Sequence, residues 1–257
     1  MNIFKKIYNY RELLKTNVKK EIRGRYKNSI LGILWSFLNP LLQLVVYSVI
    51  FGALLATGDK TYPIYICVAL IPWSFFTTVI TQASFTIIAN ENIIKKVYFP
   101  REILPLSVVV SGAVNFAIST TIIIAFVLIY GVGISWHILL YPLILLIQCV
   151  LQLGISFILS SITVYFRDLE HIIGIILLAA FYGTPIVYKI EQLPENLQVI
   201  MNLNPMTHII NAYRNIFYYH QMPDFKALGI LFGISSLLVL IGYFTFKKLQ
   251  KGFAEEL

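Results

Sequence analysis

Charged residues are scarce in this chain. Only 12% of its 257 residues are Asp, Glu, Lys or Arg, whereas 58% are hydrophobic. Soluble domains carry about 25% charged residues, so a water-soluble globule of this composition would lack the polar side chains that cover a surface. The composition therefore argues against soluble enzymes, nucleic-acid-binding modules and disordered proteins, and it favours a membrane protein.

Cysteines and known catalytic motifs are also sparse. Cys67 and Cys149 lie far apart in apolar runs without CxxC or metal-ligand spacing, so we interpret them as buried hydrophobic residues. The sequence contains no GxxxxGK[ST] phosphate loop, and His137, His208 and His220 fit packing at the external interface better than a metal site. We therefore expect no catalytic residue, no metal and no cofactor in this chain.

Uncharged intervals set the number of spans, because a membrane-spanning helix needs about 20 largely uncharged residues. The interval 103–166 is long enough for two spans, and glycines with an interfacial Trp interrupt it at 131–137. The pattern predicts an all-α polytopic membrane protein with six spans. We place them roughly at 30–56, 62–88, 103–130, 138–165, 170–188 and 227–246.

No Asp, Glu, Lys or Arg is expected in the core of any span. Proton- and sodium-coupled carriers and voltage sensors place such residues near the bilayer midplane, so their usual means of coupling is missing. The spans also offer no carboxylate or His cluster for an enzyme. If transport is active, its energy must come from another polypeptide.

Lys and Arg are distributed unevenly between the two sides of the predicted spans. Sixteen fall in residues 1–27, in the 89–102 loop, at Arg167 and in the tail from Lys247, against four on the opposite side. Cytoplasmic segments carry such an excess, so we expect both termini in the cytoplasm. The basic leader and the long first apolar run do not fit a signal peptide.

Residues 3–26 repeat apolar side chains at steps of three and four, with Lys and Arg between them. This periodicity predicts a basic amphipathic helix in the cytoplasmic membrane interface, with a solvated basic leader as the alternative. The apolar positions are Ile7, Tyr10, Leu14, Val18 and Ile22.

Two cytoplasmic loops could contact a partner. In the first, Ile93, Ile94, Val97 and Tyr98 are predicted to share one face of a short helix that Pro100 ends. Such a helix suits a partner's groove or, alternatively, the bilayer surface. The second loop is very short, and its Arg167 and Asp168 either pair to close the turn or contact the partner. The complete set of candidate contacts is Ile93, Ile94, Lys95, Lys96, Val97, Tyr98, Phe99, Arg167 and Asp168.

The external segment 189–226 is too apolar for a free loop. Asn204 and Pro205 are typical of a helix N-cap followed by proline in the first turn. We therefore expect two short helices joined at this pair that dip into the outer leaflet. Residues 247–257 would form a cytoplasmic tail.

Aromatic residues also lie within the predicted spans. Tyrosines at that depth need a polar partner or water, so these positions are candidates for a path through the membrane. They are Tyr47, Phe51, Trp73, Phe76, Phe181 and Tyr182.

Five ordered motifs resemble the ABC-2-type polysaccharide exporter permeases, and the resemblance covers essentially the whole chain. The motifs are Arg25-Tyr26-Lys27-Asn28-Ser29 with Leu31-Gly32, Trp35, Asn39-Pro40 and Tyr47 to Gly52; Lys95 to Pro105; Phe166-Arg167-Asp168; Thr184 to Tyr188; and Asn204-Pro205.

The resemblance implies one transmembrane domain over 1–257 in a homodimer, with a channel at the dimer interface and two copies of a separate ATPase subunit that bind ATP and Mg. It implies that the 91–100 helix sits in the ATPase cleft and that Asn204 and Pro205 belong to an external gate. The substrate would be lipid-linked O-antigen, capsular polysaccharide or teichoic acid, and the protein would lie in the cytoplasmic (inner) membrane. The sugars of such a polymer could slide over the aromatic faces within the spans. The alternatives are an exporter of a drug or small lipid, an uncoupled channel, or a membrane-embedded glycan enzyme.

Overall fold

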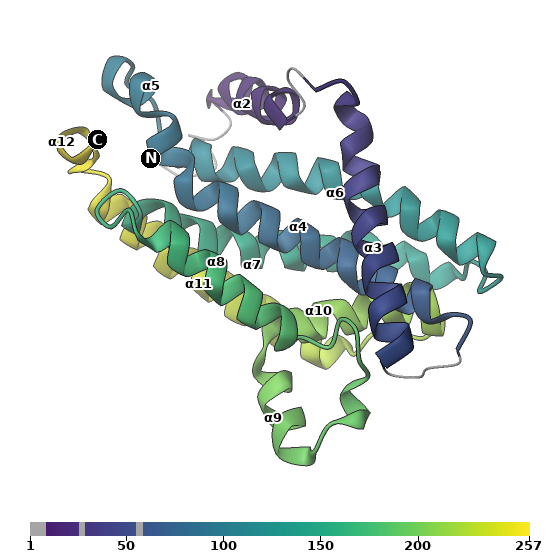
Figure 1. The fold of residues 1–257 in the computed structure, drawn as a ribbon. Helices are drawn as coiled ribbons and strands as arrows, with labels where there is room; N and C mark the ends of the chain where they lie inside the picture. The colour runs from purple at the N-terminus through teal and green to yellow at the C-terminus, as the bar shows by residue number, and fades with distance from the viewer. Residues whose placement is uncertain (1–8, 26–28, 55–58) are drawn as a thin grey trace.

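The computed structural model describes residues 9–25, 29–54 and 59–257. Within these ranges the chain forms helices and no strand (Figure 1), which confirms the all-α prediction. Parts of two predicted features lie outside the described residues, namely Ile7 of the amphipathic repeat and the motif residues Tyr26, Lys27 and Asn28.

Long apolar helices make up most of the described chain. Five of them are long and apolar enough to cross a membrane, which confirms a polytopic membrane protein. They coincide with five of the six predicted spans. They are α3 (Trp35–Leu54), α4 (Tyr62–Ala89), α6 (Ile103–Ile129), α7 (Tyr141–Ile162) and α11 (Phe225–Leu249).

The remaining predicted span, at 170–188, is a shorter helix. Helix α8 (Leu169–Tyr182) has 14 residues, so it rises about 21 Å, less than the roughly 30 Å of a hydrocarbon core. It ends early because Gly183 caps it and because Pro185 disfavours helical backbone at the residue before it. A total of six crossings therefore stays a prediction.

Helix α4 is the centre of the bundle. It packs against α3, α6, α7 and α8, and most of its side chains are buried. The backbones of helices α7 and α11 approach each other closely, because a Cβ atom at Gly242 would lie only 2.6 Å from the carbonyl oxygen of Gly154. Small residues allow such an approach of two membrane helices, so this pair is tightly fixed.

Three shorter helices gather at the end of the bundle where α4 ends and α6 begins (Figure 1). They are α2 (Arg11–Arg25), α5 (Glu91–Lys96) and α12 (Phe253–Glu256). Helix α2 packs against α6, and its Lys20 Nζ donates to Asn90 Oδ1 at 2.8 Å. The predicted helix is thus present from Arg11 to Arg25, and it packs against the protein itself.

The opposite end carries the short elements of the segment 189–226, which the sequence predicts to be external. Helix α9 (Glu195–Leu203) is exposed and projects from the bundle (Figure 1), whereas α10 (Pro205–Arg214) is mostly buried against α4 and α7. The two helices join at Asn204 and Pro205, as the sequence predicts. Their insertion into a leaflet stays a prediction. The other elements are η1 (Gly32–Leu34), η2 (Trp136–Leu140), η3 (Ile190–Gln192) and η4 (Asn215–Tyr219).

Candidate functional site

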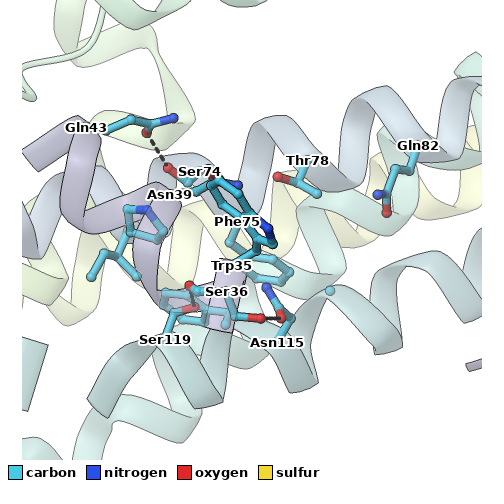
Figure 2. A pocket seen from close by; sticks show the side chains of 14 residues that line it. Trp35, Ser36, Asn39, Gln43, Ser74, Phe75, Thr78, Gln82, Asn115 and Ser119 are labelled. Carbon is cyan, nitrogen blue, oxygen red and sulfur yellow. Dashed lines mark hydrogen bonds between the residues drawn. The ribbon is translucent and has the colours of Figure 1, made fainter. Parts of the chain in front are cut away.

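A polar groove of about 470 Å³ lies between α3, α4 and α6. Most of its amide and hydroxyl side chains are spaced four residues apart on each helix, and residues at that spacing share one helix face. Figure 2 shows these side chains around one common space. The rows are Asn39 and Gln43 on α3; Ser74, Thr78 and Gln82 on α4; and Asn115 and Ser119 on α6.

Hydrogen bonds across the groove connect α3 to its neighbours. Ser36 Oγ donates to Asn115 Oδ1 at 3.0 Å, and Ser119 Oγ donates to the Ser36 carbonyl at 3.3 Å. Ser74 Oγ donates to Gln43 Oε1 at 3.4 Å (Figure 2). Polar contacts therefore hold this side of α3 against α4 and α6.

The chemistry of the groove is polar and uncharged. None of the described residues that line it is ionisable, and its walls combine amides, hydroxyls and the indole of Trp35. Unsatisfied polar groups in hydrocarbon cost several kcal/mol each, so at membrane depth this surface requires water or a hydroxyl-rich ligand. The groove is thus suited to a neutral polar ligand.

A second cavity of about 350 Å³ continues the groove between α3, α4 and α8, and the two cavities share Gln43, Ser74 and Thr78. It leads to an aromatic cluster centred on Phe181. The rings of Tyr47 and Trp73 lie 5.2 and 6.0 Å from that of Phe181, measured between centroids.

All six aromatic residues predicted to line a path belong to this cluster. Phe51 lies beside Tyr47, Phe76 beside Trp73 and Tyr182 beside Phe181, with centroid distances of 6.0, 5.5 and 5.3 Å. The structure thus brings together residues from three helices. Their role in transport stays a prediction.

The groove and the aromatic cluster lie one after the other along α3. This helix begins near α2, where Trp35, Ser36 and Asn39 line the groove, and ends beyond Tyr47 and Phe51 at the opposite end of the bundle. A ligand that moved along α3 would therefore meet amides and hydroxyls first and aromatic faces second.

The prediction for the first loop is wrong in one respect. The helix ends at Lys96, and Val97 has extended backbone, so Ile93, Ile94, Val97 and Tyr98 do not share one helix face. Ile94 and Phe99 are instead buried in a hydrophobic cluster with Phe253. The helix cannot run up to Pro100, because proline restricts the preceding Phe99 to extended backbone. Ile94 and Phe99 then join the apolar cluster that contains Phe253 of α12.

The outward side of this loop is still a candidate contact surface. Ile93 and Val97 are exposed, and the Tyr98 side chain is 96% exposed. Lys95 and Lys96 are also exposed, and Lys95 Nζ lies 3.7 Å from Glu91 Oε2.

Arg167 and Asp168 are exposed between α7 and α8. The ion pairs found in the described part of the chain do not include this pair, and the Asp168 side chain does not cap α8. The turn is held instead by Tyr165, whose backbone N–H donates to the Ile162 carbonyl at 3.0 Å and whose hydroxyl donates to the Leu249 carbonyl at 2.7 Å. The expected closing pair is thus wrong, and both side chains face solvent.

Asn204 connects α9 and α10 to the end of α8. Its Oδ1 accepts from the Met206 N–H at 2.9 Å, which confirms the predicted N-cap. Its Nδ2 donates to the Gly183 carbonyl at 3.1 Å and to Thr184 Oγ1 at 2.8 Å. The Asn204-Pro205 junction therefore fixes where α10 begins relative to α8.

Sequence reasoning missed Arg214, which it counted only as an external cation. The side chain is 2% exposed, and its two terminal nitrogens donate to the carbonyls of Pro185 and Ile186 at 2.5 and 2.7 Å. Its guanidinium lies 3.6 Å from the ring centroid of Tyr65. Burial lowers the pKa of this guanidinium from its ordinary value. Arg214 thus joins α10 to α4 and to the segment after α8.

Comparison with known proteins gives consistent matches. A family model described as ABC-2 type transporter matches residues 12–218. The O-antigen export system permease protein RfbA of Myxococcus xanthus is 34% identical over 259 residues, which cover 100% of both chains. The protein of the same name from Klebsiella pneumoniae is 35% identical over 95% of this chain and 94% of its own. The polysialic acid transport protein KpsM of Escherichia coli is 22% identical over 88% of this chain and 87% of its own.

Proposed function

Because the chain belongs to the ABC-2 type transporter family, we propose that it is the membrane-spanning permease subunit of an ATP-driven exporter of lipid-linked polysaccharide. The observation that carries the proposal is the similarity along the whole chain to permeases named for O-antigen export. The uncharged groove supports it, because its amides and hydroxyls match the hydroxyl groups of a glycan.

The groove and the aromatic cluster would form the path of the polymer. Amides such as Asn39 and Gln43 would exchange hydrogen bonds with successive sugar hydroxyls, each worth about 0.5–1.5 kcal/mol net. The rings around Phe181 would then offer stacking faces. Many weak, exchangeable contacts suit a chain that must slide without being trapped.

A separate nucleotide-binding subunit would supply the energy and bind ATP and Mg. The exposed side chains of Ile93, Lys95, Lys96, Val97 and Tyr98 would face it, with Ile94 and Phe99 fixing the loop from inside. Arg167 and Asp168 at the same end of the bundle would add to that contact.

In the proposed assembly two copies of the permease enclose the path and each binds one ATPase subunit. Both termini lie in the cytoplasm and the spans cross the inner membrane. Asn204 and Pro205 belong to the external gate. The permease purified alone should hydrolyse no ATP, measured as phosphate release.

Export itself tests the proposal. Deletion of the gene in its host should leave an envelope glycan inside the cell, and the wild-type gene should restore the glycan to the surface. Replacing Gln43 and Gln82 by Leu should reduce surface polymer severalfold, because the groove loses two amides. A matched control is Gln221→Leu, at an exposed glutamine outside the groove.

Two outcomes would contradict this account. Unchanged surface glycan in the deletion strain would refute polysaccharide export. Full export by the Gln43 and Gln82 double variant, at normal protein levels, would show that the polymer takes another route.

A further inference from the structure

A separate cavity of about 470 Å³ lies on the external segment, between α10, the chain after α8 and the start of α11. It shares no lining residue with the groove or with the cavity at the aromatic cluster. We call it the external cavity. The polar and aromatic side chains that line it are Tyr65, Glu191, Asn202, His208, Asn211, Arg214, Asn215, Tyr219 and Asp224.

Several polar groups of the external cavity have unused hydrogen-bonding capacity. The amides of Asn211 and Asn215 and the carboxylate of Glu191 take part in no side-chain hydrogen bond or ion pair within the described ranges. Each amide can donate two hydrogen bonds and accept two. These groups are therefore available to a ligand.

The Arg214 side chain gives the cavity a fixed, buried wall. Two guanidinium nitrogens are used by backbone carbonyls, whereas Nε has no hydrogen-bond partner among the described residues. A buried donor without a partner costs about 1–3 kcal/mol. Nε is buried together with the rest of the side chain, so Arg214 serves the external cavity as a rigid wall.

Asp224 and two tyrosines complete the lining. Oδ1 of Asp224 accepts from the N–H groups of Lys226 and Ala227 at 2.9 and 3.1 Å, so Oδ2 is left for another donor. Tyr219 adds exposed ring surface, whereas Tyr65 is buried and Arg214 covers its ring. Carboxylates, amides and aromatic rings around one cavity fit the hydroxyls and the apolar face of a sugar.

The same lining argues against a metal ion. No cluster of three or more His, Cys, Asp or Glu with the arrangement of a metal site occurs in the part of the chain that the structure describes. His208 Nε2 already lies 2.8 Å from the Asn202 carbonyl. The available groups are the amides of Asn211 and Asn215 and the carboxylates of Glu191 and Asp224, which can all hydrogen-bond to a neutral, hydroxyl-rich ligand.

We propose that the external cavity binds one sugar residue of the polymer after that residue has left the groove. This inference rests on the proposed function. The ligand class is a neutral sugar, because the lining carries two carboxylates against one guanidinium. A sugar held here would oppose backward sliding of the polymer between transport steps.

Ligand binding to the assembled exporter tests the site. The complex of permease and ATPase subunit in lipid nanodiscs is mixed with oligosaccharide released by mild acid from the host's own neutral surface glycan. Saturation-transfer NMR measures binding, and an oligosialic acid of similar length serves as the acidic probe. The neutral probe should bind at least tenfold more tightly than the acidic one.

Variants then locate the binding. Asn211→Ala with Asn215→Ala should weaken binding of the neutral probe roughly tenfold or more, because two amide contacts are lost. Glu191→Gln is a second variant, at an exposed side chain whose replacement leaves no buried partner. Asn196→Ala, on the exposed face of α9, is the matched control and should bind normally. Basal ATPase activity and elution volume report correct assembly of each variant.

Each alternative result has a defined meaning. Normal binding by both cavity variants, tighter binding of the acidic probe, or loss of binding on adding a chelator would overturn the sugar site. None of these affects the proposed function, which fails only if the gene is dispensable for surface glycan. Loss of binding in the cavity variants alone supports the site.

Discussion

Replacing Arg214 by Met should destabilise the end of the bundle that carries α9 and α10. Methionine fills much of the same volume, but it leaves the carbonyls of Pro185 and Ile186 without their donors and removes the cation from the Tyr65 ring. An unsatisfied buried carbonyl costs about 1–3 kcal/mol, so two of them cost about 2–6 kcal/mol. For a chain of this size 1 kcal/mol corresponds to about 2–4 °C in melting temperature. A loss of roughly 8–16 °C is therefore expected from a mid-range cost of about 4 kcal/mol.

The assay is the temperature at which half of the detergent-purified protein leaves the monodisperse peak in size-exclusion chromatography. Lys189→Met is the control, because Lys189 is an exposed cation whose Nζ lies 5.9 Å from the centroid of the same Tyr65 ring. Limited proteolysis should cut Arg214→Met faster between residues 183 and 204, where the Arg214 contacts are lost. If Arg214→Met melts within about 2 °C of the control, the two carbonyl bonds contribute little and the reasoning is refuted.

Three further predictions concern other parts of the molecule. The double variant Val97→Asp with Tyr98→Asp should prevent co-purification of the ATPase subunit without lowering membrane insertion. Both side chains are exposed, and the change would place charge in an apolar contact. An intact complex would show that the loop is not the contact. The double variant Tyr47→Leu with Phe51→Leu should slow export, measured as the ratio of surface polymer to retained polymer, and leave basal ATPase activity unchanged. Normal export would assign this helix face to lipid. Gly242→Ala should lower the melting temperature clearly, because the new Cβ atom would lie 2.6 Å from a carbonyl oxygen of α7; an unchanged melting temperature would mean that α7 and α11 separate at little cost.

Spans were the most predictable part of the fold, because exclusion of charge from hydrocarbon acts on every residue of a span. The same reasoning failed at the end of α8, where the local effects of Gly183 and Pro185 decide the helix boundary. The N-cap at Asn204 was predictable because it depends on neighbouring residues alone.

The candidate site was predictable only in part. The six aromatic residues could be selected from their depth in the spans, but their meeting at Phe181 depends on how α3, α4 and α8 pack. The polar groove left a signal in the four-residue spacing of Ser74, Thr78 and Gln82, which the search for charged residues passed over. The burial of Ile94 was not predictable, because its contact, Phe253, is distant in the sequence.

The uncharged walls of the groove have an electrical consequence. A membrane potential of 100 mV does about 2.3 kcal/mol of work on each elementary charge that crosses it. Neither the lining residues of the groove nor a neutral sugar carries such a charge, so passage of the polymer itself would be electrically silent. The membrane potential would therefore neither drive nor oppose the movement of a neutral glycan along the groove.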